Sequence, residues 1–180
     1  VAAAATVAGL QTIVSRNVDP LDAAVVSVTV LESGSAFNVI PMSARLGGTA
    51  RSLRAEIQDL IEARITAVAE SIASAHDCKA TVRYNRGYPV TENHPDATNR
   101  FREIARAEVG ADRLVEIDRP AMGGEDFAYY GQVVPACFFL LGQRPTGEAT
   151  MPELHSPRYD FNDSTIETGV RLFRRLAMEA

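Results

Sequence analysis

The sequence is poor in the residue types that build cysteine frameworks and histidine-rich metal sites. Its 180 residues contain two cysteines, three histidines and no tryptophan. The cysteines, Cys78 and Cys137, lie in different segments without a CxxC spacing, which argues against a disulfide framework or a cysteine zinc site. The chain therefore offers few side chains from which it could assemble a metal centre by itself.

The sequence also lacks long apolar runs and a surplus of positive charge. No stretch reaches the ~18 apolar residues that a membrane-spanning helix needs, and the start has no basic segment like that of a signal peptide. With 18 basic and 23 acidic residues, the net charge is -5, whereas proteins that bind nucleic acid carry clustered Lys and Arg. We expect a cytoplasmic chain with no membrane and no nucleic-acid partner.

What is present has the composition of a globular protein, with 46% hydrophobic and 23% charged residues. In its first half, hydrophobic periodicity predicts the order α-β-β-α-β. A ferredoxin-like sandwich has the order β-α-β-β-α-β, so one strand is missing at the front. The predicted elements are a helix at 1–16, strands at 24–31 and 37–46, a long amphipathic helix at 53–75 and a strand at 80–84.

The second half begins after a linker at 86–95 and alternates helices with strands, which is typical of an α/β layer. Asn162 or Asp163 can cap the last helix. The fold class is therefore α/β (α+β), in two parts at 1–90 and 91–180. The predicted elements are helices at 96–109, 124–132 and 164–178 and strands at 114–117 and 136–141.

Asn38 and Arg51 are candidate ligands for a substrate carboxylate. They lie 13 positions apart, and with an antiparallel strand and a turn between them we expect them to converge at one end. An Asn amide and the fork of a guanidinium together suit a carboxylate. The alternative is that both are ordinary polar surface residues.

Glu125 is a second candidate, in the segment MGGEDF at 122–127. The two glycines permit close backbone approach, and the acids fall at the start of the predicted helix at 124–132. The carboxylate of Glu125 could point into a cleft. Alternatively, the acids could simply favour the positive end of the helix dipole.

Of the three histidines, only His155 has a setting that suggests function. His76 ends the predicted long helix, where the dipole favours positive charge, and His94 lies in the linker. His155 follows the predicted strand at 136–141, and α/β proteins gather functional residues beyond the carboxyl ends of strands. A lone histidine is not a site, because a catalytic zinc usually takes three protein ligands.

Three segments, in this order and spacing, resemble the M20 metallopeptidase family. They are AFNVIP at 36–41, MGGEDF at 122–127 and LHSPRYDF at 154–161. The closest branch comprises amidohydrolases that cleave N-acyl amino acids, namely hippurate hydrolases, N-acetyl-amino-acid deacetylases and indole-acetyl-amino-acid hydrolases. The resemblance runs essentially from end to end.

The resemblance implies an α/β catalytic domain with an inserted ferredoxin-like lid, which often also forms a dimer. Residues 1–90 resemble the lid without its first strand, and residues 91–180 resemble the C-terminal part of the catalytic domain. We therefore expect a homodimer formed through the lid.

The resemblance also implies roles for the four candidate residues. His155 matches the last metal ligand of the family. Asn38 and Arg51 match lid residues that grip the substrate, in related enzymes from across the dimer. Glu125 matches an acidic residue close to the substrate.

The other metal ligands of the family, and its general-base glutamate, have no counterpart in this chain. We expect a piece of a longer polypeptide, which agrees with a first residue other than Met, and we expect the piece alone to be inactive. The intact enzyme would use two divalent ions, zinc or manganese, to generate hydroxide and polarise the amide carbonyl. Two alternatives stay open: a non-catalytic ferredoxin-like module for binding or dimerisation, and an M20 dipeptidase or carboxypeptidase.

Overall fold

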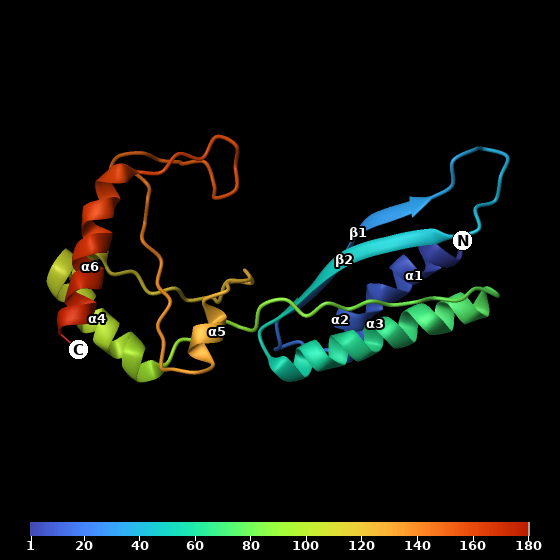
Figure 1. Cartoon of the computed structure of the whole chain (residues 1–180), viewed down its shortest axis with the longest axis horizontal. Helices are drawn as coiled ribbons and strands as arrows, with labels where there is room; N and C mark the ends of the chain where they lie inside the picture. Colours follow the sequence, from blue (N-terminus) through green and yellow to red (C-terminus); the bar gives the residue numbers. More distant parts are fainter. Residues whose placement is uncertain (180) are drawn as a thin grey trace. The chain divides into compact units, whose positions relative to one another are not determined.

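The chain folds into helices and strands that divide into two compact units. The structure is a computed structural model and describes residues 1–179. The first unit contains residues 1–90 and 121–126, and the second contains residues 91–120 and the chain from Phe127 onward. Figure 1 labels the elements. The mixed α/β class predicted from the sequence is confirmed.

The first unit is built on an antiparallel hairpin of two strands, β1 (Ala24–Ser33) and β2 (Ala44–Ser52). The register shifts between Val28 and Val30, where β1 carries one extra residue and so forms a β-bulge. Gly48 lies opposite Val28, and a Cβ atom at Gly48 would overlap the backbone oxygen of Ser27. Glycine at this position therefore allows the two strands to approach closely.

The second strand begins later than the sequence predicts. β1 confirms the strand predicted at 24–31, but residues 34–43 form a loop beyond the end of the hairpin (Figure 1), so the strand predicted at 37–46 is wrong over most of its length. Pro41 cannot donate to a strand ladder, and the side chains of Phe37 and Met42 are fully exposed. β2 instead takes in residues 47–52, which lie between the predicted strand at 37–46 and the predicted helix at 53–75.

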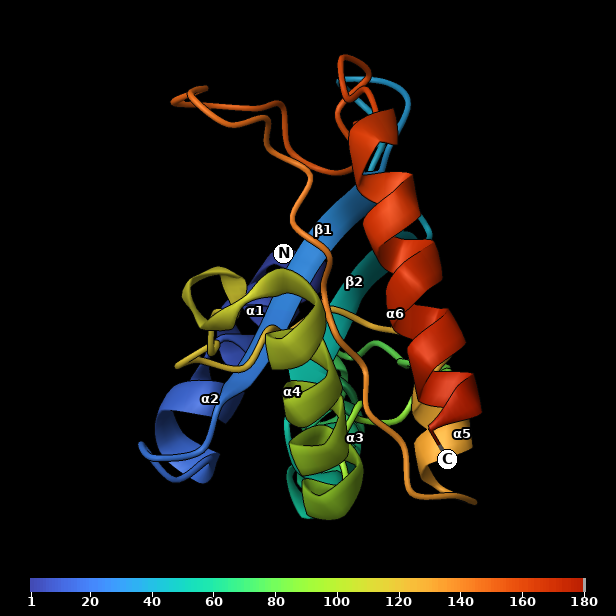
Figure 2. The ribbon, with the colours of Figure 1, turned by 90° about the vertical axis from the view of Figure 1, so that its left-hand side faces the viewer.

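Three helices pack on the hairpin and enclose the core of this unit (Figure 2). They are α1 (Ala2–Leu10), α2 (Thr12–Asn17) and α3 (Ala55–Ala75). Ile13 and Ile61 are fully buried, and alternate residues of β1 pack against their cluster, as the two-residue period of a strand requires. The long helix is confirmed, and the helix predicted at 1–16 is interrupted only at Gln11.

The segment at 80–84 is extended but is not a strand, so that prediction is wrong. Its residues alternate between half-buried and exposed, as in a strand, yet the only sheet in the described part of the chain is the β1–β2 hairpin. A strand needs a hydrogen-bonded neighbour.

The segment is followed by Arg86, which lies 2.7 Å from Asp59 and 2.6 Å from Glu62 on α3. The pKa of the Arg86 guanidinium is raised by its hydrogen bonds to these two carboxylates.

The second unit contains two main helices, α4 (Pro95–Val109) and α6 (Ile166–Met178), which pack on each other. Glu108 of α4 binds Arg171 of α6 at 2.6 Å, and Phe139 stacks on Phe101, with ring centroids 4.3 Å apart. Asn162 accepts a hydrogen bond from the Ser164 N–H and so caps the short 3-10 turn that leads into α6, whereas the N-cap of α6 itself is Thr165. The short elements are η1 (Ala111–Arg113), α5 (Ala128–Gly131) and η2 (Asp163–Thr165).

The strands predicted at 114–117 and 136–141 are extended segments without a strand partner in the described residues, so both predictions are wrong as to strand pairing. Isolated hydrogen bonds take the place of a strand ladder, and the His94 N–H donates to the Ala136 carbonyl at 2.8 Å. Asn93 accepts from the Phe138 N–H at 2.7 Å and donates to the Phe138 carbonyl at 2.9 Å. Arg102 binds Glu116 through two nitrogens and lowers the pKa of that carboxyl.

Candidate functional site

Asn38 and Arg51 lie at opposite ends of the hairpin. Arg51 pairs with Val25 near the open end, whereas Asn38 lies in the loop beyond the Ser33–Ala44 pair. Seven residues separate Ala44 from Arg51 (51 − 44 = 7), or ~23 Å at the rise of a strand. The expectation that both converge at one end of the same chain is therefore wrong, because residues 47–52 continue the strand instead of turning back.

Asn38 is surrounded by exposed apolar side chains. Phe37, Ile40 and Met42 are each more than nine-tenths exposed, and Val39 is more than half exposed. Apolar side chains gathered on a protruding loop are typical of a surface that meets a ligand or a partner. Asn38 thus lies at a tip that offers both an amide and apolar area.

Arg51 lies beside the segment that carries Glu125. Its Nη1 atom donates to the backbone carbonyl of Met122 at 2.6 Å, and Gly124 lies against Tyr88, with 3.4 Å between the ring and the position of a Cβ atom. The structure thus brings the guanidinium of Arg51 to a backbone carbonyl 71 positions away, in the segment that carries the half-buried Glu125. The sequence indicated Arg51 and Glu125 but carried no signal for the contact between Arg51 and Met122.

The segment of Glu125 is not helical, which corrects the predicted helix at 124–132. α5 begins only at Ala128, so Glu125 precedes it by three positions. The helix dipole therefore does not account for this carboxylate, because the effect of the dipole fades within the first turn. Glu125 is instead part of an irregular segment in which Met122 and Glu125 are half-buried while the glycines are exposed.

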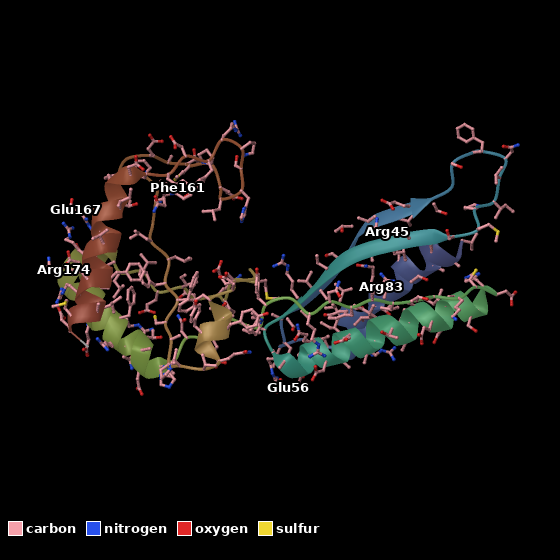
Figure 3. All side chains as sticks on the ribbon, in the orientation of Figure 1. Arg45, Glu56, Arg83, Phe161, Glu167 and Arg174 are labelled. Atoms are coloured by element: carbon pink, nitrogen blue, oxygen red, sulfur yellow. The ribbon has the colours of Figure 1, made fainter. Side chains whose placement is uncertain are left out.

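His155 occupies a backbone conformation that is unusual for its residue type. Its φ is 70°, and the Ser156 N–H donates to the Glu153 carbonyl at 3.0 Å, so His155 is the third residue of a four-residue turn. Positive φ at that position defines a type II turn and favours Gly or Asn. Residues held in this region cluster at functional sites. The exposed imidazole is thus held at the apex of a turn, in the loop that ends near Phe161 (Figure 3).

The described residues do not form a metal centre around His155, the one candidate metal ligand. Asn38, Arg51 and Glu125 belong to the first unit and His155 belongs to the second. Among residues 1–179, no group of three or more His, Cys, Asp and Glu side chains could hold a metal ion. Over the same range, no helix combines the length and apolar character that crossing a membrane requires. The donor set therefore supplies at most part of a metal site.

The other two histidines have structural roles. His76 is the C-cap of α3, as the sequence predicts. His94 is the N-cap of α4, where its Nδ1 accepts from the Asp96 N–H at 3.3 Å. Only His155 is left without such a role.

Comparison with known proteins gives matches over nearly the whole chain. Residues 3–179 match the peptidase family M20/M25/M40. An IAA-amino acid hydrolase (ILR1-like 2) of Arabidopsis thaliana is 35% identical over 99% of this chain and 41% of its own length. An N-acetyldiaminopimelate deacetylase of Anoxybacillus flavithermus is 39% identical over 97% of this chain and 44% of its own.

A solved structure has the same fold. The Bacillus subtilis YXEP protein, described as a dinuclear metal binding peptidase of the M20 family, aligns with a TM-score of 0.77 and 28% identity. The alignment covers 98% of this chain and 44% of that protein. The chain thus spans less than half the length of the curated relatives and of the solved structure that it matches.

Proposed function

Because the chain belongs to the peptidase family M20/M25/M40, we propose that it is part of a metal-dependent amidohydrolase that cleaves the amide bond of N-acyl amino acids. The observation that carries the proposal is the pairing of Arg51 with the segment of Glu125. A guanidinium that bonds a neutral carbonyl through one of its N–H groups keeps its charge and further donors for a substrate carboxylate next to the bond to be cleaved. Relatives named for IAA-amino acids and for N-acetyldiaminopimelate support this substrate class.

In this proposal, residues 1–90 form a ferredoxin-like lid and residues 91–180 form the C-terminal part of the catalytic domain. Two features support a lid sheet that needs one more strand. In the described residues, β2 has a strand neighbour on one side only. The extended segment at 80–84 has the burial pattern of a strand but no strand partner in the same residues. Arg51 binds the substrate carboxylate, and Glu125 lies close to the substrate.

His155 is proposed as one ligand of a two-metal centre whose other ligands lie outside these 180 residues. A pair of divalent ions, zinc or manganese, would polarise the amide carbonyl and supply a hydroxide nucleophile at neutral pH. Residues 1–179 do not hold such a centre by themselves. In this proposal they contribute recognition of the carboxylate and one imidazole on a hydrogen-bonded turn.

The activity is tested on the longer polypeptide that contains this chain. We expect it to hydrolyse N-acetyl, N-benzoyl and indole-acetyl amino acids, to lose this activity in a chelator and to regain it with Zn²⁺ or Mn²⁺. The 180-residue chain alone should be inactive, because it lacks the other metal ligands and a general base. The release of free amino acid measures the activity of the longer polypeptide and of the 180-residue chain. Faster cleavage of unblocked dipeptides would favour the dipeptidase alternative, and chelator-resistant hydrolysis would exclude the metal mechanism.

We also propose that the intact protein is a homodimer formed through the lid. The distance of ~23 Å along β2 keeps Asn38 away from Arg51 in one chain, so both can serve one substrate only if Asn38 comes from a second copy. The exposed apolar loop around Asn38 and the free outer edge of β1 supply surface for such an interface.

Mixing two inactive variants tests this arrangement. Asn38→Ala and Arg51→Ala homodimers should each be poorly active. After subunit exchange, half of the dimers are mixed and one of their two sites is intact, so about a quarter of the wild-type activity should return. Mixing each variant with itself is the control. No recovery after proven exchange would mean that Asn38 and Arg51 do not serve a shared site.

A further inference from the structure

Residues 121–126 form a strap that leaves the second unit and joins the first. The chain belongs to the second unit up to Pro120, contributes the strap to the first unit and returns to the second at Phe127. No residue of the strap is in a helix or a strand. Its position on the first unit therefore depends on side-chain contacts rather than on a backbone ladder.

Two residues of the first unit hold the strap. The guanidinium of Arg51 donates to the Met122 carbonyl at 2.6 Å, which is short for an N–H···O bond. The ring of Tyr88 packs against Gly124. Met122 and Glu125 are half-buried within the strap, whereas Ala121, both glycines and Asp126 are exposed. The contact with Arg51 thus lies three residues before Glu125, at one end of a short irregular run.

A guanidinium has five N–H groups, and the Met122 carbonyl uses the one that the structure identifies. The other groups can bind a carboxylate while this bond persists. The acceptor is a neutral backbone carbonyl, so the bond leaves the positive charge of Arg51 uncompensated. One side chain can therefore bind an anionic ligand and hold the strap at the same time.

We propose that Arg51 is a positioning residue for Glu125, because its guanidinium fastens the strap to β2 through the Met122 carbonyl. The link to catalysis rests on the proposed function, in which Arg51 also binds the substrate carboxylate. The strap contact itself does not, since it joins two groups of this chain. Arg51 then joins two events, binding of the carboxylate and placement of Glu125.

Methionine NMR tests the contact in the 180-residue chain without any activity. The four methionines give four ¹³C-methyl signals. The signal of Met122 reports on the strap. The signal of the fully exposed Met42 shows the chemical shift of a side chain without packing contacts. In Arg51→Ala the Met122 signal should sharpen and move toward that of Met42. Arg51→Lys, which keeps one donor but lacks the fork, should restore most of the wild-type position. Arg45→Ala, on the same strand (Figure 3), should change nothing at Met122.

The outcomes separate the two proposals. An unchanged Met122 signal in Arg51→Ala, or a Lys variant that behaves like the Ala variant, overturns the strap contact whatever the enzyme does. In the longer polypeptide, Arg51→Lys should raise KM by tenfold or more and keep kcat within a few-fold, whereas Arg51→Ala should also lower kcat. If the Lys variant loses kcat as fully as the Ala variant, Arg51 does not position Glu125. Absence of hydrolysis in the wild-type polypeptide would reject the proposed function and leave the NMR result to stand alone.

Discussion

Replacing Gly48 by Ala should lower the stability of the first unit more than a methyl group added elsewhere on the hairpin. A Cβ atom at this position overlaps the backbone oxygen of Ser27, next to the bulge in β1. A backbone atom cannot rotate away as a side chain can, so the strands must separate locally. We expect a loss of about 3 kcal/mol, at the upper end of the cost of overpacking.

Gly47→Ala is the matched control, one residue away on the same strand. There the added Cβ would lie 3.3 Å from the Val30 Cβ, a side-chain atom, and a shift of a few tenths of an ångström accommodates it. The entropy that Ala removes from the unfolded chain offsets part of the cost, so a change within about 1 kcal/mol is expected. Urea unfolding followed by circular dichroism measures both variants. Equal midpoints would show that β2 does not depend on the close approach at Gly48.

Replacing His155 by Gly should abolish activity in the longer polypeptide and leave the fold intact or slightly more stable. Glycine adopts the φ of 70° at this turn without strain, so the variant removes the imidazole and keeps the loop. If His155 binds metal, the affinity should fall by at least ~100-fold, because even partners that only orient a ligand cost 10–100-fold. Metal content by mass spectrometry and the rate of hydrolysis are the two measurements.

His76→Gly is the control for this variant, because His76 is an exposed cap at the end of α3. It should leave metal content unchanged. His155→Asn adds a second check, since Asn also tolerates positive φ but gives no imidazole. Full metal occupancy in either His155 variant would remove this residue from the proposed ligand set.

Local signals in the sequence predicted the long helices well, though not the short helix near Glu125. The long helix at 53–75 and the strand at 24–31 follow from periodicity and branched side chains, and the Asn162 cap follows from residue type alone. These features depend on neighbours within a few positions. The strands predicted at 80–84, 114–117 and 136–141 have suitable side chains but no strand partner in the described part of the chain. Strand pairing is not local, so propensity could not decide it.

The same distinction applies to the candidate residues. His155 was predicted from its loop, but nothing in the sequence indicated the positive φ that sets its side chain on a turn. Arg51 was predicted from its spacing to Asn38, and that spacing was misleading because β2 extends through residues 47–52. The contact that Arg51 makes with Met122 spans 71 positions. Its partner is a backbone carbonyl, which every residue has, so the residue types in the sequence could not predict this contact.

The strap also sets an order in time during protein synthesis. The buried cluster of Leu10, Ile13, Val18, Ile57 and Ile61 lies wholly within residues 1–90, so the first unit can form its core before the ribosome has made the strap. The strap begins 31 residues later (121 − 90 = 31), which corresponds to about 2–6 s at ordinary rates of translation. Until then, the nascent chain carries Arg51 without the Met122 carbonyl. The last piece of the first unit is thus added after every residue of its buried cluster has been made.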